Sequence, residues 1–487
     1  MRHLMWFRSD LRTADNRALY HACRDKPSRG VIALYVICPG QWRDHDESPP
    51  KIDLILRTLR ELSASLAKLN IPLLVRRVEQ RLDVPQAVAT LARELACDAV
   101  FINREYEVNE SRRDAQTERL LAGDSRRLFA FTDQVILPPD SIRTGENSFY
   151  TVFSPFKRSW LKRLEVDESA AVVPIPKPQA KLDIAPDDVP PGVSGFESSI
   201  PPETWPAGEA HAMRVLHDFV EHRIQKYKTD RNVPGTDGTS RLSPYLANGS
   251  ISPRQCLHAA REANAGKADG GSPDIAHWIS EIVWREFYVH ILVGFPRVCM
   301  NRAFRLQTEQ LRYNQDPSAF KAWSQGRTGF PIVDAAMRQM HATGWMHNRV
   351  RMIAAMFLTK NLFIDFREGE RFFMRHLVDG FFASNNGGWQ WSSSTGTDAA
   401  PYFRIFNPVS QSRNFDPDGS FIRAFVPELR TIEGDAIHAP WELPPMARAR
   451  LDYPEPIVDL SKSRAAAIAA FQALTGERLP TRPYDDV

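Results

Sequence analysis

Short apolar runs and amphipathic segments alternate along the first third of this chain, and the alternation limits the folds open to it. Four runs are typical of buried strands: Leu4–Phe7, Val31–Ile37, Leu73–Val78 and Ala99–Asn103. Four segments with helical spacing lie between and after them: Asn16–Arg24, Lys51–Asn70, Pro85–Ala96 and Asn109–Leu121. Strand and helix in turn predict an α/β domain, a doubly wound parallel sheet with helices on both faces.

The glycine-rich turn that binds dinucleotides in many such sheets is missing. Only Gly30 and Gly40 precede Gly123, whereas that turn needs glycines where the backbone approaches a pyrophosphate. Any flavin or nicotinamide is therefore expected in another part of the chain.

A proline-rich segment ends this alternation. Residues 172–206 hold nine of the 36 prolines, which predicts a semi-rigid, extended connector. Beyond it the spacing is helical in six segments: Glu209–Lys228, Pro253–Ala263, Asp274–Val293, Ile332–Thr343, Met346–Leu362 and Glu368–Leu377. The sequence thus predicts an α/β domain (1–135), a linker (136–206), a larger all-helical domain (207–475) and a tail (476–487).

Charge and cysteine content exclude several classes of protein. The 62 Lys and Arg nearly balance 59 Asp and Glu, so the chain is no polyanion binder coated in charge, although a local basic groove is compatible with the balance. Five scattered cysteines without a C-x-x-C pair argue against a disulfide framework and against a structural metal site. A charged N-terminus and the lack of a long apolar run predict a cytoplasmic protein without a membrane span.

Aromatic residues are the unusual part of the composition. There are 27 Phe, 11 Tyr and 11 Trp, and six of the Trp lie between Trp278 and Trp391. Such a density is compatible with a large core, with stacking surfaces or with a redox path, and composition does not decide between them.

Four polar residues share one helix face in the segment E-I-V-W-R-E-F-Y. Glu281, Trp284, Arg285 and Tyr288 lie at i, i+3, i+4 and i+7. A carboxylate, an indole, a guanidinium and a phenol are poor core material, because each polar group would need a buried partner. The simpler interpretation, a helix bordering solvent with half-covered aromatics, is favoured for this motif alone.

Three further motifs carry groups that could bind a phosphate or a flat ring. Asn348, Arg349 and Met352 share a face in G-W-M-H-N-R-V-R-M, although arginines that merely solvate a helix are the simpler explanation. N-N-G-G-W-Q-W, at 385–391, is a turn or helix-start signal whose two Trp point about 200° apart on a helix. Residues 238–243, G-T-S-R-L-S, could cradle a pyrophosphate or equally cap a helix.

Taken together, these residues resemble the photolyase/cryptochrome family, and most of all its bacterial class I cyclobutane pyrimidine dimer photolyases with a folate antenna. Six motifs that occur in this order carry the resemblance: W-F-R-S-D-L-R (6–12), T-S-R-L-S (239–243), W-R-E-F-Y (284–288), G-W-M-H-N-R (344–349), N-N-G-G-W-Q-W (385–391) and Y-F-R-I-F-N-P (402–408). They span nearly the whole chain. The resemblance implies a monomeric, light-driven lyase that splits pyrimidine dimers in UV-damaged DNA.

The resemblance also implies that FAD, reduced in the active form, lies in the helical domain and donates an electron to the dimer. The positions implied to hold it are Tyr227, Thr239, Ser240, Arg241, Leu242, Ser243, Trp278, Asp379, Gly380, Phe381 and Asn385. Asn385 is implied to lie near the reactive ring nitrogen of the flavin. Phe381 departs from the family, which commonly has the second Asp of D-G-D there, so one polar contact near the flavin is expected to be absent.

Lesion recognition is implied at a second set of positions. Glu281 would hydrogen-bond the dimer, while Trp284 and Trp391 would wall the pocket. The other positions implied to contact the lesion or its flanking phosphates are Arg231, Arg285, Tyr288, Asn348, Arg349, Met352 and Gln411. Enzymes of this kind extrude the damaged bases from the duplex, and photolyases are a standard example of such base flipping.

A folate antenna and an electron relay are also implied. His45, Asn109, Glu110 and Cys299 match positions associated with 5,10-methenyltetrahydrofolate, although Met300 stands where close relatives have Lys. The family's relay of three tryptophans is matched by Trp389 next to the flavin, whereas Phe366 and Tyr313 occupy the middle and outer positions. Photoactivation is therefore expected to be slow while repair persists, with Trp323 and Trp345 as candidate substitutes.

Three alternatives remain open beside the dimer photolyase. A cryptochrome-type blue-light photoreceptor would bind the same flavin without repairing DNA, and retention of the lesion positions argues against it. A (6-4) photolyase would need active-site histidines, whereas Asn348 occupies one matching position. A structural flavoprotein that binds DNA without light chemistry is the remotest option.

Overall fold

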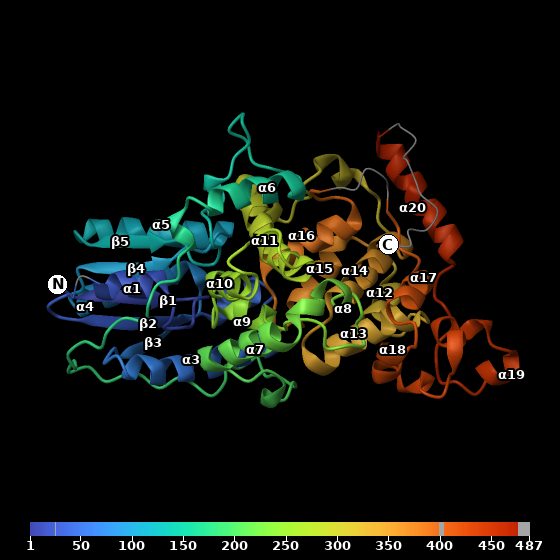
Figure 1. The fold of residues 1–487 in the computed structure, drawn as a ribbon, viewed down its shortest axis with the longest axis horizontal. Helices are drawn as coiled ribbons and strands as arrows, with labels where there is room; N and C mark the ends of the chain where they lie inside the picture. The colour runs from blue at the N-terminus through green and yellow to red at the C-terminus, as the bar shows by residue number, and fades with distance from the viewer. Residues whose placement is uncertain (25, 399–403, 476–487) are drawn as a thin grey trace. The chain divides into compact units, whose positions relative to one another are not determined.

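The computed structural model describes residues 1–24, 26–398 and 404–475 (Figure 1). The predicted tail, 476–487, lies outside these residues. The chain divides into two compact units: unit 1 comprises Met1–Gln225, Ser240–Cys299 and Val378–Phe381, and unit 2 comprises Lys226–Thr239, Met300–Leu377 and Phe382–Val487. The units interleave along the sequence and differ from the predicted domains, whose boundaries remain a prediction.

A five-stranded parallel sheet forms the N-terminal part of unit 1 (Figure 1). Its strands are β1 (His3–Phe7), β2 (Val31–Ile37), β3 (Leu73–Arg77), β4 (Ala99–Asn103) and β5 (Arg127–Phe131). Their order across the sheet is β3-β2-β1-β4-β5, and every neighbouring pair is parallel. The predicted doubly wound sheet is confirmed, with β5 as a strand that the sequence did not predict.

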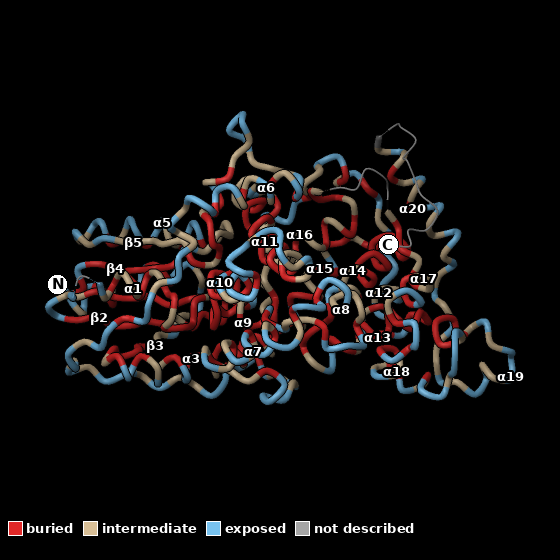
Figure 2. The backbone as a smooth tube through the Cα atoms, viewed as in Figure 1, coloured by how far each residue is buried: buried red, intermediate tan, exposed pale blue. Residues whose placement is uncertain are grey.

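Both faces of the sheet are buried, as the near-continuous apolar runs require. Met5 and Phe7 of β1 pack into one cluster with Leu59, while Leu4 and Trp6 pack into another with Val88. Side chains therefore alternate between the two clusters at the strand period of two. Figure 2 shows the three central strands, β2, β1 and β4, buried almost along their whole length.

Unit 1 contains helices that alternate with the strands of the sheet, α1 to α5, and further helices that follow β5 along the chain. They are α1 (Arg17–Arg24), α2 (Pro39–Asp44), α3 (Pro49–Ala67), α4 (Val84–Glu94), α5 (Val108–Gly123), α6 (Phe153–Leu164), α7 (Glu209–His222), α9 (Ser243–Asn248), α10 (Pro253–Ala263) and α11 (Pro273–Gly294). The predicted Glu209–Lys228 helix is too long: α7 ends at His222, and a separate short helix, α8 (Tyr227–Asp230), follows it along the chain.

The proline-rich connector is extended, as predicted, and it is also hydrogen-bonded along the sheet. Gln179 donates its backbone N–H to Leu69 O at 3.1 Å, and its side-chain oxygen accepts from the N–H of Val31 at 2.7 Å. Asp187 donates its N–H to Leu73 O at 2.9 Å and accepts from the N–H of Val75 at 2.9 Å. The connector is therefore a fixed part of unit 1.

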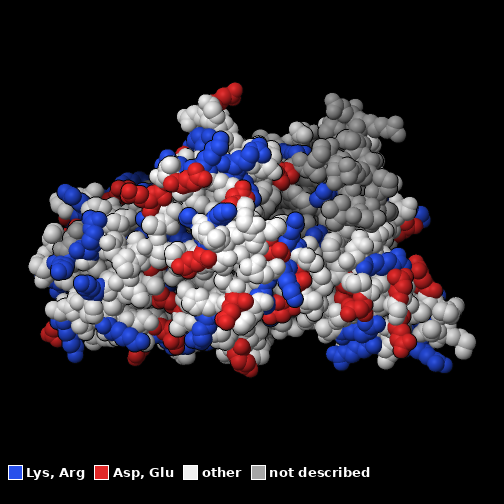
Figure 3. Space-filling view, viewed as in Figure 1, with Lys and Arg blue, Asp and Glu red and all other residues white. Residues whose placement is uncertain are grey.

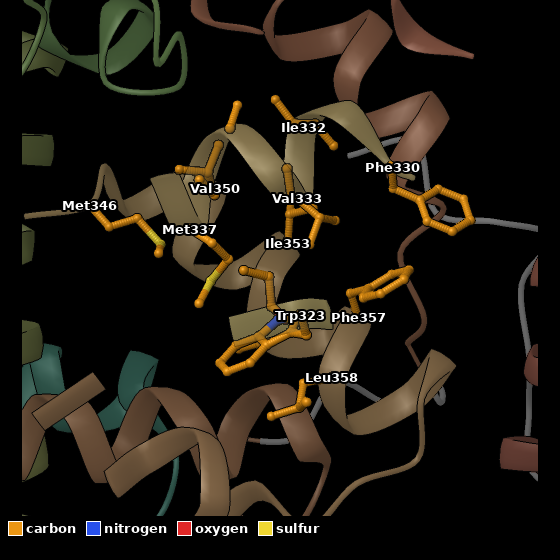
Figure 4. Packing of buried hydrophobic residues seen from close by; sticks show 14 of the residues in the cluster. Trp323, Phe330, Ile332, Val333, Met337, Met346, Val350, Ile353, Phe357 and Leu358 are labelled. Carbon is orange, nitrogen blue, oxygen red and sulfur yellow. The ribbon is translucent and has the colours of Figure 1, made fainter. Parts of the chain in front are cut away.

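The regular secondary structure among the described residues of unit 2 is helical, as predicted. Its helices are α8 (Tyr227–Asp230), α12 (Pro317–Ser324), α13 (Pro331–Thr343), α14 (Asn348–Met356), α15 (Phe366–Met374), α16 (Phe382–Ser393), α17 (Pro408–Phe415), α18 (Ser420–Phe425), α19 (Pro445–Arg448) and α20 (Leu460–Thr475). They pack around an apolar cluster in which Trp323 lies among Ile353, Phe357 and Leu358 (Figure 4).

Two predicted elements of unit 2 differ in detail. The Asn-Asn-Gly-Gly segment lies inside α16 and forms no turn, because α16 already begins at Phe382. The predicted Met346–Leu362 helix begins at Asn348, where the ring of His347 caps it by accepting from the N–H of Arg349. It changes to π geometry over Phe357–Asn361.

Candidate functional site

The predicted polar face of α11 is present and half-buried. Trp284 stacks on Phe153 with ring centroids 3.6 Å apart and planes within 8°, and Tyr288 lies 5.7 Å from the same indole. Glu281 lies one turn earlier and pairs with His277 at 3.4 Å. The favoured interpretation of a helix with half-covered aromatics is correct, and the stacking holds the Trp284 indole in one orientation.

Arg285, on the same face, turns its guanidinium into the protein. It donates to the backbone carbonyls of Gln134 and Leu246 and lies 4.1 Å from the ring centroid of Phe381. Burial lowers the pKa of Arg285 to about 10, although Glu286 acts in the other direction. The phosphate contact implied for Arg285 is therefore not prepared in this arrangement. At position 381, where a carboxylate is expected from the family resemblance, this chain has Phe381, so Arg285 faces an aromatic ring.

Glu286 is a buried carboxylate that the sequence motif did not single out. It accepts from the backbone N–H of Ile136, from that of Leu137 at 3.4 Å and from the indole N–H of Trp160 at 2.6 Å. Burial raises its pKa to about 7, although these three N–H groups favour the charged form. Its donors lie more than 120 residues away along the chain, so no local pattern could have revealed it.

Glu286 predicts a pH dependence of stability. Because its pKa rises from an ordinary 4.5 to about 7 on folding, the folded chain holds this proton more tightly. Its contribution to the free energy of unfolding is complete below pH 4.5 and is lost as the pH rises to about 7. Relative to the wild type, Glu286→Gln should therefore gain on the order of 2–3 kcal/mol between these pH values. Urea unfolding of both proteins across this range measures the difference, and a constant difference would contradict it.

Three parts of the predicted flavin site lie in unit 1: the loop around Arg241, the indole of Trp278 and the segment 379–381. Arg241 adopts φ +51°, a left-handed conformation that costs free energy in a non-glycine residue and often marks a functional loop. The loop leads into α9, whose N-cap residue is Leu242, and a leucine side chain cannot accept a hydrogen bond from the N–H groups of the first turn. The predicted hydroxyl cap is thus absent. Trp278 is buried against Phe219, with ring centroids 5.2 Å apart.

The 379–381 segment is fixed from within unit 1. Lys51 donates its ammonium to the backbone carbonyl of Gly380 at 2.7 Å, and Asp379 is buried. This ammonium also pairs with Glu47 at 2.6 Å. The backbone at Gly380 is therefore held by a helix of the sheet domain.

Unit 2 carries the remaining flavin positions. Asn385 donates its side-chain N–H to the carbonyl of Glu370 at 3.0 Å, so the orientation of its amide is fixed.

The two indoles of α16 differ in burial. Trp389 is 2% exposed, whereas Trp391, two positions on, is half-buried, as their opposite directions on a helix predict. Arg404 lies 5.6 Å from the ring of Trp391. Tyr227 is buried and lies against Arg231 at 5.8 Å.

A basic cluster surrounds the predicted lesion positions of α14. Arg349 donates to the side chain of Asn232 at 2.6 Å and lies 4.0 Å from the ring of Phe415. Burial lowers its pKa to about 10, and the positive charges of Arg231 and Arg404 add to this effect. Three guanidinium groups that repel one another form a site that an anion would stabilise.

The other predicted positions in unit 2 differ in exposure. Asn348 is exposed and its amide nitrogen lies 3.9 Å from the sulfur of half-buried Met352. Gln411 is fully buried on α17, so a phosphate contact is not prepared there. On the face in Figure 3, positive and negative side chains are interspersed, as the near-zero net charge predicts.

Three of the four predicted antenna residues lie together in unit 1. His45 is 3.0 Å from the amide nitrogen of Asn109 and 3.3 Å from the carboxylate of Glu110. Gln41 also donates to Glu110, at 3.1 Å. The fourth, Cys299, is half-buried and free of any disulfide. This connected set can recognise both donors and acceptors of a polar ring.

A cavity of about 730 Å³ lies beside the first turn of α5, the helix that carries Asn109 and Glu110. Its lining includes Arg104, Tyr106, Ser111, Arg112, Thr132 and Pro296. At the start of the same helix, burial and, to a smaller extent, the negative charge of Glu110 raise the pKa of Glu107 to about 8.

The described residues offer neither a cluster of metal-binding side chains nor a membrane-spanning helix. No group of three or more His, Cys, Asp or Glu among them could hold a metal ion. In the same part of the chain, no helix is both long and apolar enough to cross a membrane.

The fold and these residues define a flavin-binding class of protein, and comparison with known proteins gives the family. Residues 3–179 match the model for DNA photolyase, and residues 278–473 match that for the FAD binding domain of DNA photolyase. The chain is 45% identical to the deoxyribodipyrimidine photo-lyase of Escherichia coli over 97% of this chain and 98% of that protein. The chain belongs to the DNA photolyase family.

Solved structures agree with this assignment. A class III photolyase from Agrobacterium tumefaciens is 35% identical, with a TM-score of 0.87 over 98% of each chain. A cryptochrome from Synechocystis is 27% identical, with a TM-score of 0.84 over 96% of this chain and 98% of that chain. This chain is therefore a light-dependent DNA repair enzyme of the photolyase family that uses FAD.

The residues present fit a flavin. The buried indole N–H of Trp389 has no acceptor within the part of the chain that the structure describes, and buried donors normally have a partner, which a bound ligand or an ordered water can supply. Asn385 adds a fixed amide on the same helix. In unit 1, the strained loop at Arg241 carries hydroxyl and guanidinium groups suited to phosphates.

Proposed function

We propose that this enzyme splits cyclobutane pyrimidine dimers in UV-damaged DNA, as a monomer in the cytoplasm, with a folate antenna beside its FAD. The observation that carries the proposal is the 45% identity to a deoxyribodipyrimidine photo-lyase over almost all of both chains. Reduced FAD, when bound, supplies an electron that light has raised in energy. The roles of the protein's own residues follow from their positions and chemistry.

Flavin binding is assigned to two sets of residues. Thr239–Ser243 and Tyr227 hold the phosphates and the ribityl chain, with Trp278 packed beside them. Asp379, Gly380 and Phe381 would line the ring system, and Asn385 would present its amide to the reactive ring nitrogen and stabilise the reduced or radical form. The support is the strained backbone at Arg241 and the hydrogen bond that fixes Asn385 on Glu370.

Lesion recognition is assigned to a carboxylate and aromatic walls. Glu281 hydrogen-bonds the extruded pyrimidines and stabilises the charge that develops on them. Trp284 and Trp391 stack on their faces, with Tyr288, Asn348 and Met352 completing the pocket. The support is the preorganised Trp284–Phe153 stack and the half-exposed state of both indoles. A dimer stacks and pairs poorly, so extruding it costs less than extruding normal bases.

Phosphates that flank the lesion are assigned to the basic cluster of unit 2. Arg231 and Arg349 bind them, and Arg404 adds positive potential; Arg285 and Gln411 are weaker candidates because of their burial. Neutralising phosphates releases counterions, so affinity for DNA falls as salt concentration rises.

The antenna is assigned to His45, Asn109, Glu110 and Cys299. The support is the hydrogen-bonded set formed by the first three. Bound 5,10-methenyltetrahydrofolate would extend light absorption beyond that of the flavin.

A repair assay tests this function. Enzyme with chemically reduced flavin is mixed with dimer-containing DNA and exposed to near-UV or blue light, and the remaining dimers are counted. Dimers should disappear in light and persist in darkness. Equal persistence in both would contradict repair and favour a photoreceptor that binds the same flavin.

Glu281→Ala should lower the repair yield per absorbed photon by several-fold, because a hydrogen bond to developing charge is lost. The measurement is dimers repaired per photon at saturating DNA, with DNA affinity measured separately and expected to change less. Glu262→Ala is the matched control, since Glu262 pairs with His258 at i,i+4 as Glu281 pairs with His277, but lies on exposed α10 surface. Equal losses in yield and affinity would show that Glu281 acts in binding alone.

A further inference from the structure

Two of the three relay positions implied by the family, the middle and the outer one, hold residues that are poorly suited to oxidation in this chain. Phe366 is 1% exposed, and a phenyl ring without a heteroatom is very hard to oxidise. At the outer position, burial raises the pKa of the Tyr313 phenol, which disfavours the proton loss that accompanies oxidation of tyrosine. The inner indole, Trp389, therefore needs another electron donor if it is to be re-reduced.

A second indole lies directly beside Trp389. The ring centroids of Trp323 and Trp389 are 6.1 Å apart with planes at 76°, an edge-to-face contact. Phe373 touches both rings, at 4.8 Å from Trp389 and 6.1 Å from Trp323. All three side chains belong to unit 2 and are at most 2% exposed.

We propose that Trp323 is the electron donor to oxidised Trp389 and replaces the Phe366 position in the light-driven reduction of the flavin. This inference rests on the proposed binding of FAD next to Trp389. Trp389 gives one electron to the light-excited oxidised flavin, and Trp323 then gives one electron to Trp389. No bond of the protein is made or broken, and the electron vacancy comes to rest on Trp323. An external thiol then gives Trp323 one electron, becoming a thiyl radical and releasing its proton.

The surroundings of Trp323 make it the end of the relay. Its indole N–H donates to the carbonyl of Ala354 at 3.0 Å, and a peptide carbonyl is too weak a base to take the proton. Its other ring neighbours include Phe320 and Phe372, at 5.6 and 5.5 Å, which are not oxidised by an indole radical. The oxidised residue is thus a protonated indole cation radical. Since Trp323 is 0% exposed, reductants reach it slowly.

Flash photolysis of the oxidised holoenzyme without DNA tests the relay. Transient absorption follows the tryptophan radical, and steady illumination with a thiol measures reduction of the flavin. Trp323→Phe should shorten the radical's lifetime and lower flavin reduction to the level of Trp389→Phe. Trp441→Phe is the matched control, because Trp441 is an indole of unit 2 that packs against Phe330, with ring centroids 5.2 Å apart, and it is expected to leave both unchanged. Flavin content and melting temperature show whether each variant is folded.

A second measurement needs no variant. In the wild type, the long-lived radical should have the spectrum of a protonated indole cation. A deprotonated indole radical or a tyrosyl radical would overturn the proposal, as would undiminished flavin reduction in Trp323→Phe. Loss of repair by chemically reduced enzyme would contradict the proposed function instead, because that assay bypasses the relay.

Discussion

Arg254→Met is expected to lower the free energy of unfolding by about 3–5 kcal/mol, because it leaves a buried charge without its partner. Arg254 is 0% exposed and donates to the carboxylate of Asp15 at 2.9 Å and to that of Asp133 at 2.6 Å. Arg12 also donates to Asp133, at 2.7 Å. Two guanidinium groups and two carboxylates thus neutralise one another inside unit 1.

The four charges depend on one another. Burial alone would raise the pKa of Asp133, but Arg12 and Arg254 hold it below its usual value. Removing Arg254 leaves two carboxylates facing one guanidinium in a site that water does not reach. The loss therefore includes the cost of a buried negative charge and exceeds that of an exposed ion pair.

Urea unfolding measures this effect, with Arg261→Met as the control. Arg261 is an exposed arginine on the same helix, α10, and its guanidinium donates to a nearby loop carbonyl, Gly266 O, at 2.9 Å. Its replacement should change the free energy of unfolding by no more than about 0.5 kcal/mol. Equal stabilities of the two variants would contradict the role of the buried charges.

Gly369→Ala is expected to destabilise the protein although alanine favours helices. A Cβ at Gly369, inside α15, would lie 2.1 Å from one ring carbon of Trp389, 2.4 Å from another and 2.7 Å from Leu358. The helical preference for alanine is worth about 1 kcal/mol, whereas overpacking a core costs about 1–3 kcal/mol and sometimes more. Because the indole is buried and flanked by Phe373, the steric cost should win.

Gly388→Ala, also in unit 2, is expected not to destabilise the protein, in contrast to Gly369→Ala. Gly388 lies in α16, and no described atom lies within 4 Å of a Cβ placed there. This variant should be as stable as the wild type or up to about 1 kcal/mol more stable. Thermal unfolding of both variants without flavin makes the comparison. Gly369→Ala as stable as Gly388→Ala would show that α15 can shift away from the indole.

The strands and the large helices could be predicted from local pattern, and their exceptions have physical reasons. β5 carries an apolar run, Leu128–Phe131, but it lies at an edge of the sheet and none of its five residues is fully buried, so its pairing with β4 is what establishes it as a strand. The glycines of α16 contradict local helix propensity, which tertiary packing overrides here. Both cases depend on neighbours that are distant along the chain.

Among the site residues, too, some features follow from local spacing and others depend on contacts between distant parts of the chain. Burial of Trp389 and partial exposure of Trp391 follow from helical spacing alone. By contrast, the partners of Glu286 lie in α6 and in the segment before it, and those of Arg254 lie in the loops after β1 and β5. The contact between Trp323 and Trp389 joins residues that are 66 positions apart, and no spacing rule predicts it.

The connector along β3 protects the molecule against aggregation. β3 is an edge strand, and an uncovered edge presents unpaired N–H and C=O groups to which another chain can add a strand. Asp187 occupies two of these groups, one donor and one acceptor, on Val75 and Leu73. Prolines such as Pro186 and Pro190 lack the N–H that a strand joining from outside would need. The segment that links the two halves of the sequence therefore also closes one side of the sheet to self-association.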